Sequence, residues 1–247
     1  MKLQLLAVST LLAVATAAYA DNTFERTLSV SSQADVYVST GAGDIKITPS
    51  SDNQVHVKGH VHASWSAFGD VKSREQRIID NPPIVQNGNQ IRIGETTDRG
   101  LLSNISIDYE LSVPSSVALN LHSGSGDIEV ANVGRYLSAA TGSGSVRIHE
   151  FNGGLTLRTG SGDIEANGRL ASSSNVNTGS GSVRLHLNPD SHFNLQAATG
   201  SGDIRVNFPG APKQDDNSRH HLTASINGGG DPLEIHTGSG DIEVTPR

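Results

Sequence analysis

Four aspartates stand at the same place in a repeated Thr-Gly-Ser-Gly-Asp-Ile phrase, and their type and spacing could support chemistry. They are Asp127, Asp163, Asp203 and Asp241. A regular column of carboxylates can bind calcium, as in the β-roll repeat G-G-x-G-x-D-x-U-x. Here Asp follows the second glycine directly and intervening copies carry Ser instead, which halves the number of ligands. We expect these aspartates to lie in turns or on a solvent-facing surface, with a calcium site as the alternative.

The same carboxylates raise the alternative of a polysaccharide-acting β-helix. If they occupy every second copy of a stack, they lie about 10 Å apart, near the upper limit for the acid and base of an inverting glycosidase. Repetition by itself produces this geometry, and a single Trp leaves little aromatic surface for stacking sugars. We therefore predict no catalytic residues and no enzyme.

Three histidines are the other candidates for metal binding. His56, His60 and His62 fall on one face of an alternating segment, and His60 and His62 are close enough to share an ion. No Asp or Glu accompanies them in the local sequence, and ten histidines are ordinary for an exposed surface of this size. They remain metal candidates, and no cofactor is expected.

The glycines of the phrase do not predict a phosphate-binding loop. A dinucleotide loop needs a third glycine and a following helix, whereas each Gly-x-Gly here precedes an alternating β pattern. We attribute the glycines to backbone angles that other residues avoid at a tight corner. The copies begin at Gly41, Gly124, Gly142, Gly160, Gly179, Gly200 and Gly238.

The period of the copies predicts stacked strands. From the second copy on, the steps are 18, 18, 19, 21 and 38 residues, and we assign a degenerate copy, Thr223 to Asn227, to the last gap. Apolar residues recur three and five positions before the first glycine and four and six after it, which gives two strands per repeat. One repeat cannot bury these columns alone, so the copies must stack into a continuous core.

Two polar columns test which copies touch. Asp alternates with Ser after the second glycine, and Glu alternates with Arg two residues later, with Arg184 beside Arg205 as the one clash. In a parallel stack such neighbours lie about 4.8 Å apart, where like charges repel. A hydroxyl before every first glycine, as in Thr141, can bond to the next copy or cap the corner.

The N-terminal half is less regular. Residues 24–64 alternate as strands, residues 65–82 contain a charged stretch that predicts a short helix, and Asn87-Gly88 predicts a hairpin within residues 84–93. Residues 105–113 form a further alternating strand. We predict one domain over residues 21–247, with irregular strands in residues 21–116 and regular repeats in residues 117–247.

The first twenty residues have the pattern of a secretory signal peptide. Lys2 precedes an apolar run, and Ala18-Tyr19-Ala20 is a small-x-small cleavage site, so the mature chain is expected to begin at Asp21. No later segment is apolar enough to span a membrane. Without the signal, 17 basic and 25 acidic residues leave a net charge of −8, which argues against nucleic acid as a partner. The absence of cysteine excludes disulfides.

The tandem T-G-S-G-D-I units behind a signal peptide, with Ile107 to Pro114 ahead of them, resemble the bacterial "putative adhesin" domains of unknown function. The resemblance covers roughly residues 30–247. It implies an all-β fold, a single-stranded, right-handed parallel β-helix, and it implies no catalytic residues.

These observations predict an exported, non-enzymatic β-solenoid, periplasmic or on the cell surface. We expect adhesion or another cell-envelope interaction with a protein or glycan. The alternatives are an envelope scaffold that self-associates through its C-terminal rung, because the chain ends soon after a strand, and the calcium-binding or polysaccharide-acting β-helix above.

Overall fold

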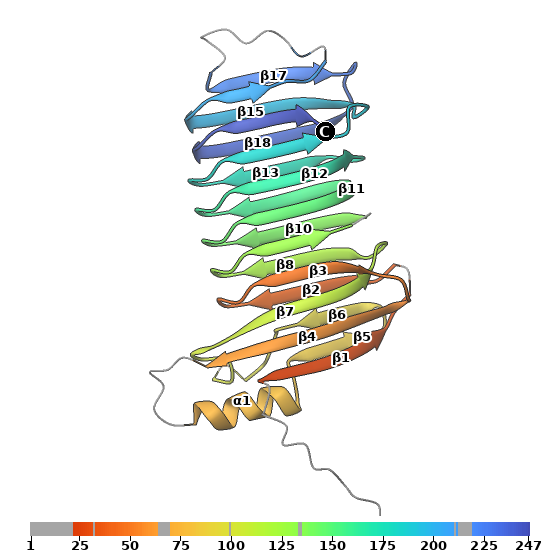
Figure 1. Cartoon of the computed structure of the whole chain (residues 1–247), viewed down its shortest axis with the longest axis vertical. Helices are drawn as coiled ribbons and strands as arrows, with labels where there is room; N and C mark the ends of the chain where they lie inside the picture. Colours follow the sequence, from red (N-terminus) through yellow and green to blue (C-terminus); the bar gives the residue numbers. More distant parts are fainter. Residues whose placement is uncertain are drawn as a thin grey trace, which may run out of the picture.

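The computed structural model describes residues 22–31, 33–63, 70–98, 100–132, 135–209, 211 and 219–247. The predicted signal peptide and cleavage site lie outside these residues. The described chain is mostly β, with one helix and a 19-stranded, mostly parallel mixed sheet that curves nearly closed (Figure 1). None of the helical residues in these ranges forms a segment long and apolar enough to cross a membrane.

The strands form two layers, which we call sheet A and sheet B. In sheet A the first two pairings are antiparallel and the others parallel. Its order is β1 (Thr23–Ser29), β4 (Gln54–Ala63), β7 (Ile105–Pro114), β3 (Ile45–Ser50), β9 (Ile128–Ala131), β11 (Val146–Thr159), β12 (Ile164–Leu170), β14 (Val183–Leu187), β19 (Ile242–Pro246) and β16 (Ile204–Val206).

Sheet B is antiparallel only at its two ends. A strand of sheet B, a glycine corner and the following strand of sheet A make one rung. The order in sheet B is β5 (Ile84–Asn87), β6 (Gln90–Ile93), β2 (Asp35–Thr40), β8 (Ala118–Ser123), β10 (Tyr136–Thr141), the second part of β11, β13 (Ser174–Thr178), β18 (Asp231–Ser239), β15 (Phe193–Ser201) and β17 (His221–Ile226).

The predicted apolar columns form the core. Successive side chains of a strand point to opposite faces, so the columns from the two sheets meet between the layers. Leu119 and Leu121 of β8 are 1% exposed, and Ile128 and Val130 of β9 are fully buried. The equivalent residues of the later rungs belong to the same continuous core. This part of the fold follows from the period-two pattern.

The rungs do not follow sequence order at the C-terminal end. The last rung, β18 and β19, lies between the rung of β13 and β14 and the rung of β15 and β16. Figure 1 shows β18 between β13 and β15. The prediction that the rungs stack in chain order is therefore wrong for the final two.

Two further predictions are wrong because they also assumed that the rungs stack in chain order. The segment Thr223 to Asn227 is not a degenerate parallel rung, because β17 pairs antiparallel with β15. The C-terminal rung is not an open edge either, because β19 is paired with β14 on one side and β16 on the other. Edge-to-edge pairing through this rung, the predicted route of self-association, has no free strand edge to use.

The corner glycines, with the exception of Gly41, are needed for close stacking. A Cβ on Gly162 would lie 1.9 Å from the carbonyl oxygen of Gly144 in the neighbouring rung, and one on Gly126 would lie 2.1 Å from that of Gly43. Among the repeat glycines described, only Gly202 has a φ in the region that disfavours other residues (152°). The interpretation from backbone angles is therefore wrong for most corners.

The hydroxyl column has both of its predicted roles. The Thr178 Oγ1 accepts a hydrogen bond from the N–H of Gly181 in its own corner (3.1 Å) and donates to the carbonyl of Gly162 in the neighbouring rung (2.9 Å). Thr141 and Thr159 make the same two bonds. These hydroxyls are buried, so the bonds satisfy backbone groups that water cannot reach.

The predicted short helix is α1 (Val71–Asp80), which packs Val71 and Ile78 against the β1 and β4 end of the core (Figure 1). The predicted hairpin is also present. However, its turn residues are Gly88 and Asn89, because Asn87 pairs with Gln90. Of these two, only Gly88 has a positive φ (59°).

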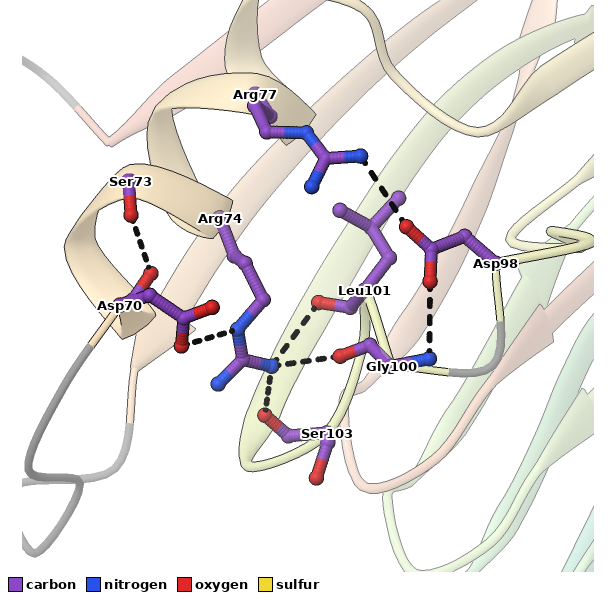
Figure 2. Close-up of polar contacts among 8 residues, drawn as sticks. All are labelled: Asp70, Ser73, Arg74, Arg77, Asp98, Gly100, Leu101 and Ser103. Carbon is purple, nitrogen blue, oxygen red and sulfur yellow. Dashed lines mark hydrogen bonds and ion pairs between the residues drawn. The ribbon is translucent and has the colours of Figure 1, made fainter.

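An arginine pair on α1 holds the loop that leads into β7 (Figure 2). The Arg74 guanidinium donates to the carbonyls of Gly100 and Ser103 at 2.7 Å each, and its side chain is only 13% exposed. Arg77 pairs with Asp98 at 3.1 Å. The N–H of Gly100 and then Arg77 lower the pKa of Asp98. The helix therefore closes this end of the molecule by polar contacts as well as apolar ones.

Candidate functional site

The outer face of sheet A carries a row of charged side chains, one from each strand, which we call the charge ladder. Every member is opposite in sign to both neighbours, and adjacent strands lie about 4.8 Å apart. In strand order the ladder is Glu25, Lys58, Glu110, Lys46, Glu129, Arg147, Glu165, Arg184, Glu243 and Arg205.

The ladder corrects the one clash that the sequence suggested. Arg184 and Arg205 are not neighbours, because Glu243 of the inserted rung lies between them. The Lys46 Nζ is 3.7 Å from a carboxylate oxygen of Glu129. The hydrogen bond that Arg147 donates to Asp127 is the main cause of a raised pKa of Arg147, and the charges of Glu165 and Glu129 add to it. The alternation thus extends along the whole sheet, beyond the repeats that predicted it.

The aspartate column lies beside the ladder and connects the rungs. The Asp127 Oδ1 accepts the backbone N–H of Ser145 in the neighbouring rung at 2.8 Å, and its Oδ2 lies 2.9 Å from Arg147. The pKa of Asp127 is lowered, mainly by the hydrogen bond from the N–H of Ser145 and then by Arg147. Asp163 has the same arrangement with Ser182 and Arg184.

The last two aspartates are neighbours rather than two rungs apart. The Asp241 Oδ1 accepts the N–H of Asp203 at 2.9 Å, and Arg205 contacts both carboxylates, at 2.9 Å and 3.3 Å. The N–H of Asp203, then Arg205, lowers the pKa of Asp241. The predicted Asp/Ser alternation and its 10 Å spacing are therefore wrong here. Carboxylates engaged in this way favour a bridging role over calcium binding or glycoside hydrolysis.

Each histidine candidate faces a different carboxylate. The His56 Nε2 lies 3.0 Å from Asp52, His60 lies 3.9 Å from Glu110, and His62 lies 2.7 Å from Asp108. Asp108 and Glu110 belong to β7, far away in sequence, so the local sequence did not reveal them. Asp52 lies only four residues before His56, so the prediction that no acid accompanies the histidines locally is wrong for His56.

Two open grooves bring part of the candidate set together. One, of about 520 Å³, lies over β1, β4, β7 and β3 and is lined by His56, Lys58 and Lys46 among others. The other, of about 440 Å³, is lined by His60, His62 and Asp127. Asp163, Asp203 and Asp241 line neither groove. Among the residues described, no three His, Asp or Glu side chains are grouped closely enough to hold a metal ion.

The outer face of sheet A is therefore the candidate site, and the repeats did not predict four of its ten ladder residues. The repeats revealed six ladder residues: Glu129, Arg147, Glu165, Arg184, Arg205 and Glu243. The members from β1, β4, β7 and β3 lie outside the regular repeats that begin at residue 117. Antiparallel pairings join β1, β4 and β7, and parallel pairings place β3 between β7 and β9. A usable signal was present in the alternation of Val55-His56-Val57-Lys58, which places Lys58 on an outer face.

Comparison with known proteins supports a family assignment. The family model described as "Toastrack DUF4097" matches residues 18–245. No curated protein matches the chain.

Similar solved structures are distant in sequence. A "putative cell adhesion protein" from Clostridium sporogenes is 12% identical, with 91% of this chain and 100% of that chain covered and a TM-score of 0.48. A "putative adhesin" from Bacteroides fragilis is 13% identical, with coverage of 90% and 96% and a TM-score of 0.40. A "putative lipid binding protein" from Parabacteroides distasonis is 12% identical, with the same coverage and a TM-score of 0.34.

Proposed function

Because the chain belongs to the Toastrack DUF4097 family, as its repeat predicted, we propose that it is an exported, non-enzymatic recognition protein of the cell envelope. Its ligand would be a protein or a glycan with charges spaced to match the outer face of sheet A. The regular part of the fold is proposed to be a single-stranded, right-handed parallel β-helix that holds this face rigid.

The charge ladder is the observation that carries the proposal. Ten charged side chains stand in one row, all of them exposed or half-buried, and parallel hydrogen bonding fixes most of their spacing. Charged groups held at fixed spacing give specificity and fast association with a complementary surface. By contrast, the aspartates are engaged in bonds between rungs, and the described residues offer no convergent acid, base and nucleophile.

Export is proposed from the N-terminal pattern alone. Fractionation of cells that express the full chain tests it: the protein should appear in the periplasm or medium without residues 1–20. A chain found uncleaved in the cytoplasm would contradict export.

Binding is tested on arrays of glycans and of envelope and matrix proteins, with the chain that begins at Asp21. The matched variants are Glu165→Arg on the ladder and Ser138→Arg on the outer face of sheet B. We expect hits that weaken at high salt and are lost in Glu165→Arg but kept in Ser138→Arg. Hits that both variants keep would place recognition elsewhere, and turnover of an arrayed polysaccharide would favour an enzyme.

A further inference from the structure

We propose that two copies of this chain associate through the outer faces of their sheets A. The copies are related by a two-fold axis that runs parallel to the strands and passes between β9 and β11. This interface uses a second copy as its only partner and occupies the face proposed above for the ligand, so dimerisation and ligand binding would compete.

The symmetry of the charge ladder carries the inference. The ladder has an even number of members, begins with Glu25 and ends with Arg205. A two-fold axis parallel to the strands reverses the strand order, so Glu25 of one copy meets Arg205 of the other, and Glu129 at the centre meets Arg147. Strict alternation then makes every facing pair opposite in charge. An isologous interface requires this kind of self-complementary patch.

Two further columns of outward-facing residues lie on either side of the ladder, and both are compatible with the two-fold dimer. The column from Thr27 through His56 to Asn207 contains no Asp, Glu, Lys or Arg, so it adds no repulsion. In the aspartate column the same axis places His60 opposite Asp241. The one like-charged combination is Asp44 opposite Asp163, against five opposite-charge combinations in the ladder, and the two-fold axis repeats each combination twice.

The face is also large and accessible enough. Ten strands about 4.8 Å apart, with three outward columns about 7 Å apart, give about 45 Å by 15 Å, or about 700 Å² on each copy. Stable specific interfaces bury about 800 Å² per partner. The side chains are accessible to a partner, since Lys46 is 53% exposed, Arg147 46% and Arg205 52%.

The shape of the face fits a reversed partner. The groove of about 520 Å³ lies in the half with the ladder lysines, whereas the arginines lie in the other half. Reversal places the long side chains of Arg184 and Arg205 opposite Glu110 and Glu25, which line this groove. An axis that passes through a strand, rather than between two, would instead pair like charges along the whole ladder.

The main test uses two complementary sets of variants. One set removes positive charge (Arg147→Gln, Arg184→Gln and Arg205→Gln), and the other removes negative charge (Glu129→Gln, Glu165→Gln and Glu243→Gln). Sedimentation velocity at low salt should show a dimer for the native chain and association at least about tenfold weaker for each set alone. An equimolar mixture should recover association, because a negative face then meets a positive one. A mixture no stronger than either set alone would overturn the proposal.

The salt dependence of dimerisation tests the proposal even if the multiple variants do not fold. The native dimer should weaken by about tenfold or more between roughly 20 mM and 500 mM salt, because screening shortens the reach of exposed charges. Ser138→Arg on sheet B should behave like the native chain. A chain that stays monomeric at every salt concentration, or a dimer that salt does not affect, would refute the interface.

The register is tested by crosslinking, because the native chain has no cysteine to interfere. The axis places Ala131 of one copy opposite His149 of the other. A short bismaleimide should therefore link a chain with Ala131→Cys to a chain with His149→Cys, across sheets about 10 Å apart. Linkage should fail when either chain is paired with Thr156→Cys on sheet B. Equal linkage to Thr156→Cys would show random collision and overturn the assigned register.

Discussion

The outer faces of sheet A and sheet B avoid repulsion between stacked side chains in two different ways. Both present one side chain per strand about 4.8 Å apart in parallel register, where identical charges would repel. Sheet A alternates the sign, as in Glu129, Arg147 and Glu165. Sheet B largely omits charge: the equivalent column contains two charged residues among ten, namely Val85, Arg92, Tyr37, Asn120, Ser138, Thr156, Asn175, Glu234, Gln196 and Thr223.

The difference between the two faces shows that the fold does not depend on the charge ladder. Neutral side chains satisfy the stacking rule on sheet B, so the fold does not require charges on either sheet. The one acid in the sheet B column, Glu234, accepts a hydrogen bond from Asn175 at 3.0 Å. The ladder on sheet A is therefore a property of that surface, which is why we assign recognition and self-association to it.

The largest expected effect on stability is at a glycine corner, where a strand of sheet B leads into a strand of sheet A. Gly162→Ala should lower the free energy of unfolding by about 3 kcal/mol, because its Cβ would overlap the Gly144 carbonyl. Gly41→Ala is the matched control, since a Cβ there meets nothing within 4 Å. Urea denaturation of both variants measures the difference. Equal losses would show that the corners are not held by close stacking.

The next effect compares a buried hydroxyl with an exposed one. Thr178→Val keeps the shape but removes two hydrogen bonds to buried backbone groups, so we expect a loss of about 2 kcal/mol. Thr223→Val on the outer face of sheet B should change stability by less than about 0.5 kcal/mol. Thermal unfolding of the two variants checks this, and a tolerated Thr178→Val would rule out the hydroxyl column as a connection between rungs.

A smaller effect tests the charge rule itself. Glu165→Arg creates three consecutive arginines on sheet A with Arg147 and Arg184, so stability at low salt should fall by about 1 kcal/mol and recover in high salt. Ser138→Arg on sheet B has the neutral neighbours Asn120 and Thr156 and should show no such salt dependence. If the two variants respond alike to salt, the distinction between the faces is wrong.

The smallest effect is a pH dependence confined to sheet A. The pKa of Asp127 is lowered from its usual value of 3.8 in the folded chain. Its carboxylate therefore stabilises the fold above about pH 3.8, and this contribution is lost as the pH falls through the folded pKa. Solvent screening limits it to about 0.5 kcal/mol.

The matched variant for this effect is Asp127→Asn, which keeps an acceptor for the N–H of Ser145 but removes the charge. Unfolding free energies measured from pH 5 to pH 2.5 should fall less steeply than in the native chain. An unchanged slope would show that Asp127 does not contribute to acid sensitivity.

The sequence predicted the columns because period-two alternation and stacking are local rules. It could not predict the rung order, since Leu233, Ile235, Ile242 and Val244 fit the core as well beside one neighbouring rung as beside another. The predicted clash between Arg184 and Arg205 was a signal of the inserted rung. Nonlocal pairings explain the other misses: the carboxylates beside His60 and His62, and the four ladder members from β1, β4, β7 and β3, come from strands that only the fold brings together.

The inserted rung also has a consequence for the order in which the chain folds. Residues 193–206 pair with the preceding rungs only through β18 and β19, which are made last. Strands can pair in chain order from the N-terminus as far as β14. The next rung in the stack is β18 and β19, so pairing with this edge must wait until these strands are made. A chain interrupted before residue 231 would leave the β15 to β17 unit without its attachment. The rung of β18 and β19 is therefore what joins the β15 to β17 unit to the rest of the stack.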